Sequence, residues 1–146
     1  MFVLIVGCGR TGSSLAAAML ADGHEVSCLD EDPESEGRLQ AVVGKDFAEA
    51  GGTLTIGTAL EGSALEEAGI AKADVFIAST DGDNTNIVIA QIAERKYGVE
   101  TVIARVMDPL RAEWYGNQGL NTVCPTRAAI ELLQGRVRAM ASEMDD

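Results

Sequence analysis

The sequence predicts an α/β protein with one doubly wound parallel sheet of about six strands, flanking helices and a helix at the C-terminal end. Two observations predict this fold class. Short apolar runs alternate with segments of helical periodicity along nearly the whole chain, which is typical of a parallel sheet covered on both faces. The first apolar run also leads directly into a glycine-rich turn and a helix. The 146 residues suffice for one domain with a sizeable core.

The N-terminal stretch predicts a complete βαβ unit. Residues 2–6 form a continuous apolar run, as expected of a strand buried on both faces. The following residues 7–12, GCGRTG, match the pattern GxGxxG, and residues 13–21 place apolar side chains at helical spacing. Residues 25–29 predict a second strand, which ends on Asp30. This order of elements is typical of a Rossmann-like dinucleotide-binding turn, although GxGxxG alone also occurs in plain βαβ turns.

Each feature of this turn has a chemical reason. Gly7 permits a tight turn, Gly9 lets a pyrophosphate approach the backbone, and Gly12 lets the helix pack close to the strand. The free N–H groups at the start of the helix attract phosphate. Asp30 can accept hydrogen bonds from the ribose hydroxyls of adenosine and repels a 2′-phosphate. We therefore expect NAD(H) or an adenine nucleotide such as ATP or ADP as the ligand, with NADP disfavoured.

The rest of the chain continues the alternation. Asp32 and Pro33 read as the N-cap and first position of a short, weak helix. The later expected strands are residues 53–57, 73–78, 101–106 and 122–124, and the later helices are 61–68, 84–97, 109–115 and 126–140. Residues 142–146 read as a frayed tail that follows a domain of residues 1–141.

In a doubly wound sheet, ligands bind beyond the carboxyl ends of the strands, where the strand order reverses. Topology alone therefore predicts one crevice that collects the strand-end residues. They are Gly7 to Gly12, Asp30, the segment Gly57, Thr58 and Ala59, then Thr80, Asp81 and Arg105.

Composition excludes several classes of function. The net charge of −12 argues against nucleic acid as a partner, because phosphate backbones need a positive surface. No apolar run is long enough to cross a membrane, and Met1 leads straight into the first strand without room for a signal peptide. The cysteines Cys8, Cys28 and Cys124 lack metal-site spacing, so we expect no metal and a cytoplasmic protein.

No catalytic constellation is present. The sequence contains neither a nucleophile elbow nor a zinc-protease motif, and its single histidine, His24, lies in the turn before the second strand. A dehydrogenase needs a further region that holds the substrate, and little chain remains for one. We therefore expect a protein that is not an enzyme. The alternative is a small NAD-dependent oxidoreductase or its detached cofactor-binding domain.

Several motifs resemble a known family, the RCK, KTN or TrkA-N domains of potassium-transport regulators. The resemblance runs from Val3 to about Leu133. Beyond the glycine turn, it rests on LEEAGI and AD at residues 65–74, STDGDNTN at 79–86, IARVMDP at 103–109, and PT at 125–126. The family resemblance implies a C-terminal crossover helix and a cytoplasmic regulatory subunit, peripherally associated with a membrane potassium transporter or channel. It also implies a homodimer or larger ring.

The resemblance further implies roles for single residues. It places Gly7, Cys8, Gly9, Arg10 and Thr11 around the phosphates of NAD(H), ATP or ADP. It places Asp30 at the adenosine ribose, Thr80 and Asp81 beside the second ribose or phosphate, and Arg105 towards the phosphates. Two departures stand out. The family often has Gly-Asp-Ala where this chain has Gly57, Thr58 and Ala59, and the usual smaller C-terminal domain is missing. The latter implies either a separate C-terminal-domain subunit as partner or a piece of a longer chain.

Structural roles compete with some of these interpretations. Arg10 can be a solvated helix-start residue, Arg105 can be an ion-pair partner of Asp81, and Thr80 with Asp81 can cap the following helix. The last expected helix carries an apolar stripe, which predicts that the chain is at least a homodimer. The stripe consists of Ala129, Ile130, Leu133, Val137 and Met140.

Overall fold

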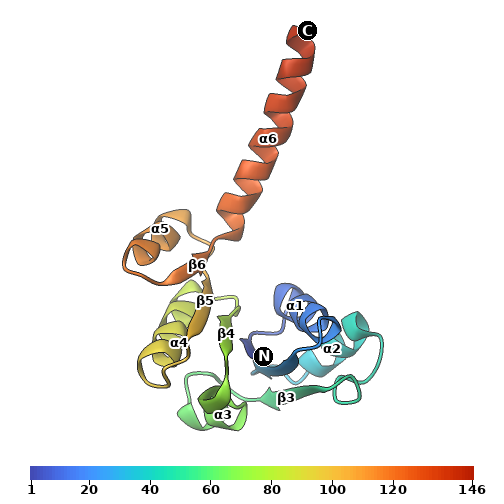
Figure 1. Cartoon of the computed structure of the whole chain (residues 1–146), viewed down its shortest axis with the longest axis vertical. Helices are drawn as coiled ribbons and strands as arrows, with labels where there is room; N and C mark the ends of the chain where they lie inside the picture. The colour runs from blue at the N-terminus through green and yellow to red at the C-terminus, as the bar shows by residue number, and fades with distance from the viewer.

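The computed structural model describes residues 1–146 and contains one six-stranded sheet with the order β3-β2-β1-β4-β5-β6. All strand pairs are parallel, so the predicted doubly wound sheet is confirmed (Figure 1). The strands are β1 (Phe2–Val6), β2 (Glu25–Asp30), β3 (Gly52–Ile56), β4 (Val75–Ala78), β5 (Thr101–Arg105) and β6 (Asn121–Val123). The helices are α1 (Arg10–Ala21), α2 (Ser35–Val43), α3 (Gly62–Glu67), α4 (Asp83–Arg95), α5 (Pro109–Asn117) and α6 (Pro125–Asp145), with a 3-10 turn η1 (Ile70–Lys72).

The core has two parts, one on each face of the sheet. Alternate side chains of a strand point to opposite faces, so Val3 and Ile5 of β1 pack in one apolar cluster and Leu4 and Val6 in the other. Helices α1 and α2 cover the first face, while α3, α4 and α5 contribute to the second. Burial on both faces explains why β1 is a continuous apolar run rather than an alternating one.

Most helix bounds differ by a few residues from the sequence-based expectation, and the differences at α2 and α6 have a clear physical reason. The N-cap position of α2 is Glu34 rather than Asp32, and the carboxylate of Asp32 instead accepts the N–H of Glu34 at 3.0 Å in the turn before the helix. Helix α6 continues to Asp145, past the expected end at Met140, because no glycine or proline follows Gly135 to stop it.

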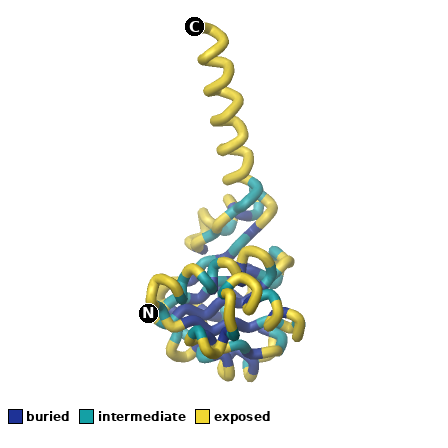
Figure 2. The backbone as a smooth tube through the Cα atoms, turned by 90° about the vertical axis from the view of Figure 1, so that its right-hand side faces the viewer, coloured by how far each residue is buried: buried dark blue, intermediate teal, exposed yellow.

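Helix α6 projects away from the sheet, and none of its residues is buried (Figures 1 and 2). Ile130, Leu133, Val137 and Met140 expose between 47% and 69% of their surface. Their spacing of three and four residues puts them on one face of the helix. None of the helices combines the length and apolarity that crossing a bilayer requires.

Candidate functional site

A cleft of about 800 Å³ lies at the carboxyl ends of the strands, where the strand order reverses between β1 and β4. Most of the strand-end residues selected from the sequence line it together: Gly7, Gly9, Arg10, Thr11, Asp30, Gly57, Thr58, Ala59, Thr80, Asp81 and Arg105. Cys8 and Gly12 are buried and do not line the cleft.

The glycines of residues 7–12, which we call the glycine loop, differ in what requires them. Gly7 has a φ of +95°, and a Cβ there would overlap the carbonyl of Ser79. A Cβ on Gly12 would overlap the carbonyl of Gly7. Gly9 has an ordinary φ of −78°, and a Cβ there would meet no atom of the protein within 4 Å. The folded chain itself therefore needs glycine at positions 7 and 12 but not at position 9.

The N-terminus of α1 borders the cleft without a side-chain cap. Gly9 occupies the N-cap position, its carbonyl accepts the N–H of Ser13 at 2.9 Å, and the first turn holds no acidic side chain. The N–H groups of the first turn have no partner within the helix, and the helix dipole adds positive potential there. Arg10, which is exposed, adds a full positive charge. This end of the helix can hold an anion.

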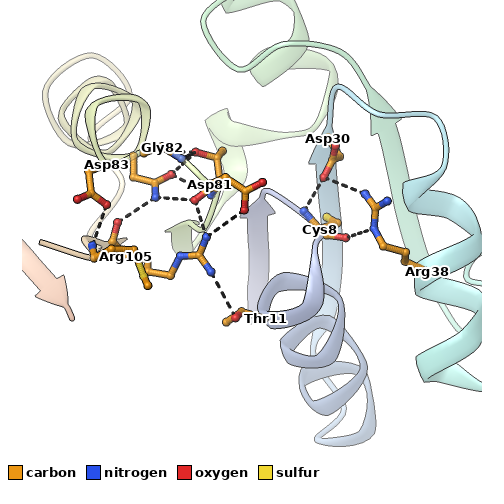
Figure 3. A network of polar contacts seen from close by, with 11 residues as sticks. Cys8, Thr11, Asp30, Arg38, Asp81, Gly82, Asp83 and Arg105 are labelled. Atoms are coloured by element: carbon orange, nitrogen blue, oxygen red, sulfur yellow. Dashed lines mark hydrogen bonds and ion pairs between the residues drawn. The ribbon is translucent and has the colours of Figure 1, made fainter. Parts of the chain in front are cut away.

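Asp30 closes one end of the cleft, and its carboxylate holds the neighbouring backbone. Oδ2 accepts the N–H of Cys8 at 2.7 Å (Figure 3), and Oδ1 accepts the N–H of Asp32 at 2.8 Å. The side chain is only 12% exposed. Asp30 therefore fixes the glycine loop as well as presenting a carboxylate to the cleft.

Arg38 is a cleft residue that the sequence reasoning missed. Its Nε donates to the carbonyl of Cys8 at 2.9 Å, and its Nη1 donates to Oδ2 of Asp32 at 3.1 Å. Nη2 lies 3.7 Å from Oδ2 of Asp30 (Figure 3). The hydrogen bond with Asp32 raises the pKa of Arg38. Two hydrogen bonds lower the pKa of Asp32. The larger effect comes from the N–H of Glu34 and the smaller one from the side chain of Arg38. In the sequence, the only local signal for the position of Arg38 is the turn at Asp32 and Pro33, which starts a helix close to Asp30.

Arg105 closes the opposite end of the cleft. Its Nη2 donates to the carbonyl of Thr80 at 2.6 Å and lies 3.6 Å from Oδ1 of Asp81, while Nη1 donates to Oγ1 of Thr11 at 3.3 Å (Figure 3). Asp81 is fully exposed, so its ion pair with Arg105 contributes little. The Nε of Arg105 is buried without a partner.

Asn86 holds the turn before α4 in place and was also missed. It is 1% exposed, accepts hydrogen bonds from the N–H and hydroxyl of Thr80, and donates to the carbonyls of Thr80 and Arg105. Asp83 accepts the N–H groups of Met107 and Asp108. The N-cap of α4 is Gly82, with no side-chain cap, so Thr80 and Asp81 do not cap this helix. Within the motif at residues 79–86, the spacing T-x-x-D-x-x-N of Thr80, Asp83 and Asn86 could have identified Asn86.

The cysteines and the single histidine do not line the cleft. Cys8 and Cys28 are fully buried, and contact with the Cys8 thiol together with burial raises the pKa of Cys28. His24 precedes β2, whereas the cleft lies at the carboxyl end of that strand.

Thr58 and Ala59 line the cleft near the exposed side chain of Leu60, without a carboxylate in that segment. The site thus offers hydrogen-bond donors and charges rather than a nucleophile with a base.

Comparison with protein families gives one match over most of the chain. The model of the TrkA-N domain matches residues 3–125. The chain is also 41% identical over 143 residues to the Trk system potassium uptake protein TrkA of Streptomyces coelicolor. That alignment covers 98% of this chain and 61% of the relative, so the chain spans about three fifths of the relative's length.

Solved structures show the same fold at low sequence identity. The Kef C-terminal domain of Shewanella denitrificans, solved in an AMP-bound form, has a TM-score of 0.74 and 22% identity, and the match covers 99% of this chain and 93% of that one. The structure of GsuK bound to ADP has a TM-score of 0.72 and 22% identity, over 91% of this chain and 32% of that one.

Proposed function

The chain belongs to the TrkA-N domain family, and we propose that it is a nucleotide-binding regulatory subunit of a membrane potassium uptake system or channel. Gly9 carries the proposal that the cleft binds a nucleotide. Neither backbone conformation nor packing requires glycine at this position, yet the position borders the cleft and the open N-terminus of α1. A missing side chain there has a purpose when a phosphate group lies against the backbone.

The charges of the cleft fit NAD(H), ATP or ADP. We expect Arg10 and Arg105, which line the cleft, to bind phosphates, and the carboxylate of Asp30 to accept hydrogen bonds from the hydroxyls of an adenosine ribose. The same carboxylate disfavours the 2′-phosphate of NADP. We expect Thr58 and Ala59, which follow β3 and line the cleft, to contact the base, and Thr80 and Asp81 to contact the second ribose or phosphate. The Kef domain and GsuK, which have a similar fold, bind AMP and ADP, respectively. This favours an adenine nucleotide as the ligand of the present cleft.

We further propose regulation rather than catalysis. The cleft residues include no histidine or cysteine, and the two buried thiols belong to Cys8 of the glycine loop and Cys28 of β2. A small oxidoreductase would need a general acid or base next to a bound nicotinamide. Thr80 and Asp81 line the cleft where we expect that region, but the carboxylate of Asp81 is fully exposed to solvent and is paired with Arg105. The resemblance to a TrkA protein favours a cytoplasmic position on a potassium transporter.

The proposed assembly is a homodimer or larger ring. Helix α6 carries apolar residues at positions 130, 133, 137 and 140, and the fold of a single chain leaves all of them exposed. Apolar residues at intervals of three and four form the seam along which two helices pack. A second copy of the chain supplies the same seam. Because the TrkA relative is longer, a separate subunit or segment that provides a C-terminal domain is a further proposed partner.

A thermal-shift screen with AMP, ADP, ATP, NAD, NADH and NADP tests nucleotide binding. A ligand present at a hundredfold excess over Kd should stabilise the protein by about 2.7 kcal/mol. The proposal fails if none of them raises Tm. A second experiment tests regulation. In cells of the source organism, the gene is replaced by a variant that folds but does not bind nucleotide, and potassium uptake is compared with that of wild-type cells. If the variant has lost nucleotide binding but uptake is unchanged, the regulatory role is refuted, whereas the proposal that the wild-type cleft binds a nucleotide still stands.

A further inference from the structure

The Asp30 end of the cleft contains more charge than recognition of a ribose requires. Asp30, Glu31 and Asp32 line it together, and Arg38 is the cation among them. Both carboxylate oxygens of Asp30 already accept backbone N–H groups, at 2.7 and 2.8 Å. The carboxylate of Asp30 is thus fixed in position. The group at this end of the cleft that could change its partner is the guanidinium of Arg38.

The guanidinium of Arg38 makes two hydrogen bonds, and its remaining nitrogen, Nη2, lies 3.7 Å from Oδ2 of Asp30. Its Nε donates to the carbonyl of Cys8 at 2.9 Å, which supports the glycine loop. Its Nη1 donates to Oδ2 of Asp32 at 3.1 Å, and this pair is partly exposed, with 36% of the Arg38 side chain and 45% of the Asp32 side chain accessible. The first contact is structural. The second pairs the Nη1 side of the guanidinium with a carboxylate that is itself partly exposed to solvent.

We infer that Asp32 determines whether the cleft accepts a phosphate on the 2′-oxygen of adenosine, because it occupies the guanidinium edge that would otherwise bind that phosphate. Arginine binds phosphate through two parallel N–H donors and is the residue that accommodates a 2′-phosphate in other dinucleotide-binding folds. With Asp32 charged, Arg38 is neutralised, and Asp30 and Glu31 repel the added phosphate. The inference rests on the proposed function, since it requires an adenosine ribose at this end.

Replacement of Asp32 by Asn separates this role from folding. The carbonyl oxygen of Asn can still accept the N–H of Glu34, as Oδ1 of Asp32 does at 3.0 Å. Its amide then stands where Oδ2 faced Arg38, and an NH₂ group cannot accept a hydrogen bond from a guanidinium. The contact of Arg38 with Cys8 does not involve Asp32 and is kept. Glu31→Gln is the matched control, because it removes the same charge from a cleft residue that forms no ion pair with Arg38.

The test uses AMP and adenosine 2′,5′-bisphosphate, which differ only in the 2′-phosphate. Calorimetric titration gives the ratio of their dissociation constants for the wild type, Asp32→Asn, Glu31→Gln, and Asp32→Asn combined with Arg38→Gln. In Asp32→Asn we expect preference for the bisphosphate to rise about tenfold, as a freed arginine gains a bidentate phosphate contact. In Glu31→Gln it should rise about threefold or less, since that change removes only a general repulsion. In the double variant the gain should disappear.

The outcomes separate this inference from the proposed function. An equal gain in Asp32→Asn and Glu31→Gln, or no gain in Asp32→Asn, overturns the role of Asp32 while nucleotide binding stands. A gain that persists in the double variant shows that Arg38 is not the acceptor of the phosphate and overturns the inference as well. A wild-type protein that binds neither probe, nor ADP or NADH, overturns the proposed function together with this inference.

Discussion

Arg105 and Thr11 are 94 positions apart in the chain, yet Nη1 of Arg105 donates a hydrogen bond to Oγ1 of Thr11 at 3.3 Å (Figure 3). Thr11 belongs to the first turn of α1, and Arg105 ends β5, on the other side of the point where the strand order reverses. The contact joins the two halves of the sheet beside the glycine loop. A ligand phosphate at the start of α1 would therefore lie within reach of the Arg105 guanidinium.

Arg105→Ala should weaken binding of ADP about 10- to 150-fold, because each charge-assisted hydrogen bond contributes roughly 1.5–3 kcal/mol. It should also reduce discrimination among ADP, ATP and NAD(H), which differ in phosphate charge. Arg105→Lys is the control that retains the charge without the planar donor set. Calorimetric titrations with the three nucleotides measure both effects. Unchanged affinities would mean that Arg105 is a structural partner of Thr80 and Asp81.

Asn86→Ala should lower the free energy of unfolding by about 2–4 kcal/mol, because it leaves buried backbone groups around Thr80 and Arg105 without partners. Urea denaturation followed by circular dichroism measures the change. Asn84→Ala, an exposed position in the same helix, should cost about 0.5 kcal/mol or less and serves as the control. Equal stabilities of the two variants would contradict the structural role given to Asn86.

The sequence predicts the fold and most of the cleft because their signals are local. The apolar run of β1, the GxGxxG pattern of residues 7–12 and the acid that ends β2 can each be recognised within a short segment of the sequence. Arg38 and Asn86 escaped the sequence reasoning for a different reason. Each reaches its partners from a helix, and both sets of partners include backbone groups that are distant in the chain. Such contacts depend on tertiary placement, which periodicity does not encode.

The cysteines should differ sharply in reactivity towards a thiol reagent at pH 8. Cys124, which is partly exposed, should react in the native protein. Cys8 and Cys28 should react only after unfolding, because both are buried and the Cys8 contact and burial raise the pKa of Cys28, so little thiolate forms. Mass spectrometry of the modified protein identifies the sites. Rapid native labelling of Cys28 would show that the core beneath the glycine loop opens.

Leu133→Asp should convert the proposed dimer into a single chain of 15.3 kDa, because it places a charge in the seam of α6. Leu132→Asp is the matched control, since Leu132 is 73% exposed but lies about 100° around the helix from Leu133. Light scattering at micromolar concentration measures the masses. A wild-type mass of one chain, or equal effects of the two substitutions, would refute packing along this seam.

The claim that a nucleotide phosphate lies against the glycine loop is tested most directly at Gly9. Gly9→Ala adds one methyl group in a space that holds no protein atom within 4 Å, so the variant should keep the wild-type Tm without ligand. Gly135→Ala, which also meets no neighbouring atom but lies in α6, is the control. Calorimetric titration with ADP should show binding to the wild type and to Gly135→Ala. Binding to Gly9→Ala should be at least about tenfold weaker, because the added methyl group blocks the approach of the phosphate to the backbone. Equal affinity for ADP in all three proteins would contradict the account.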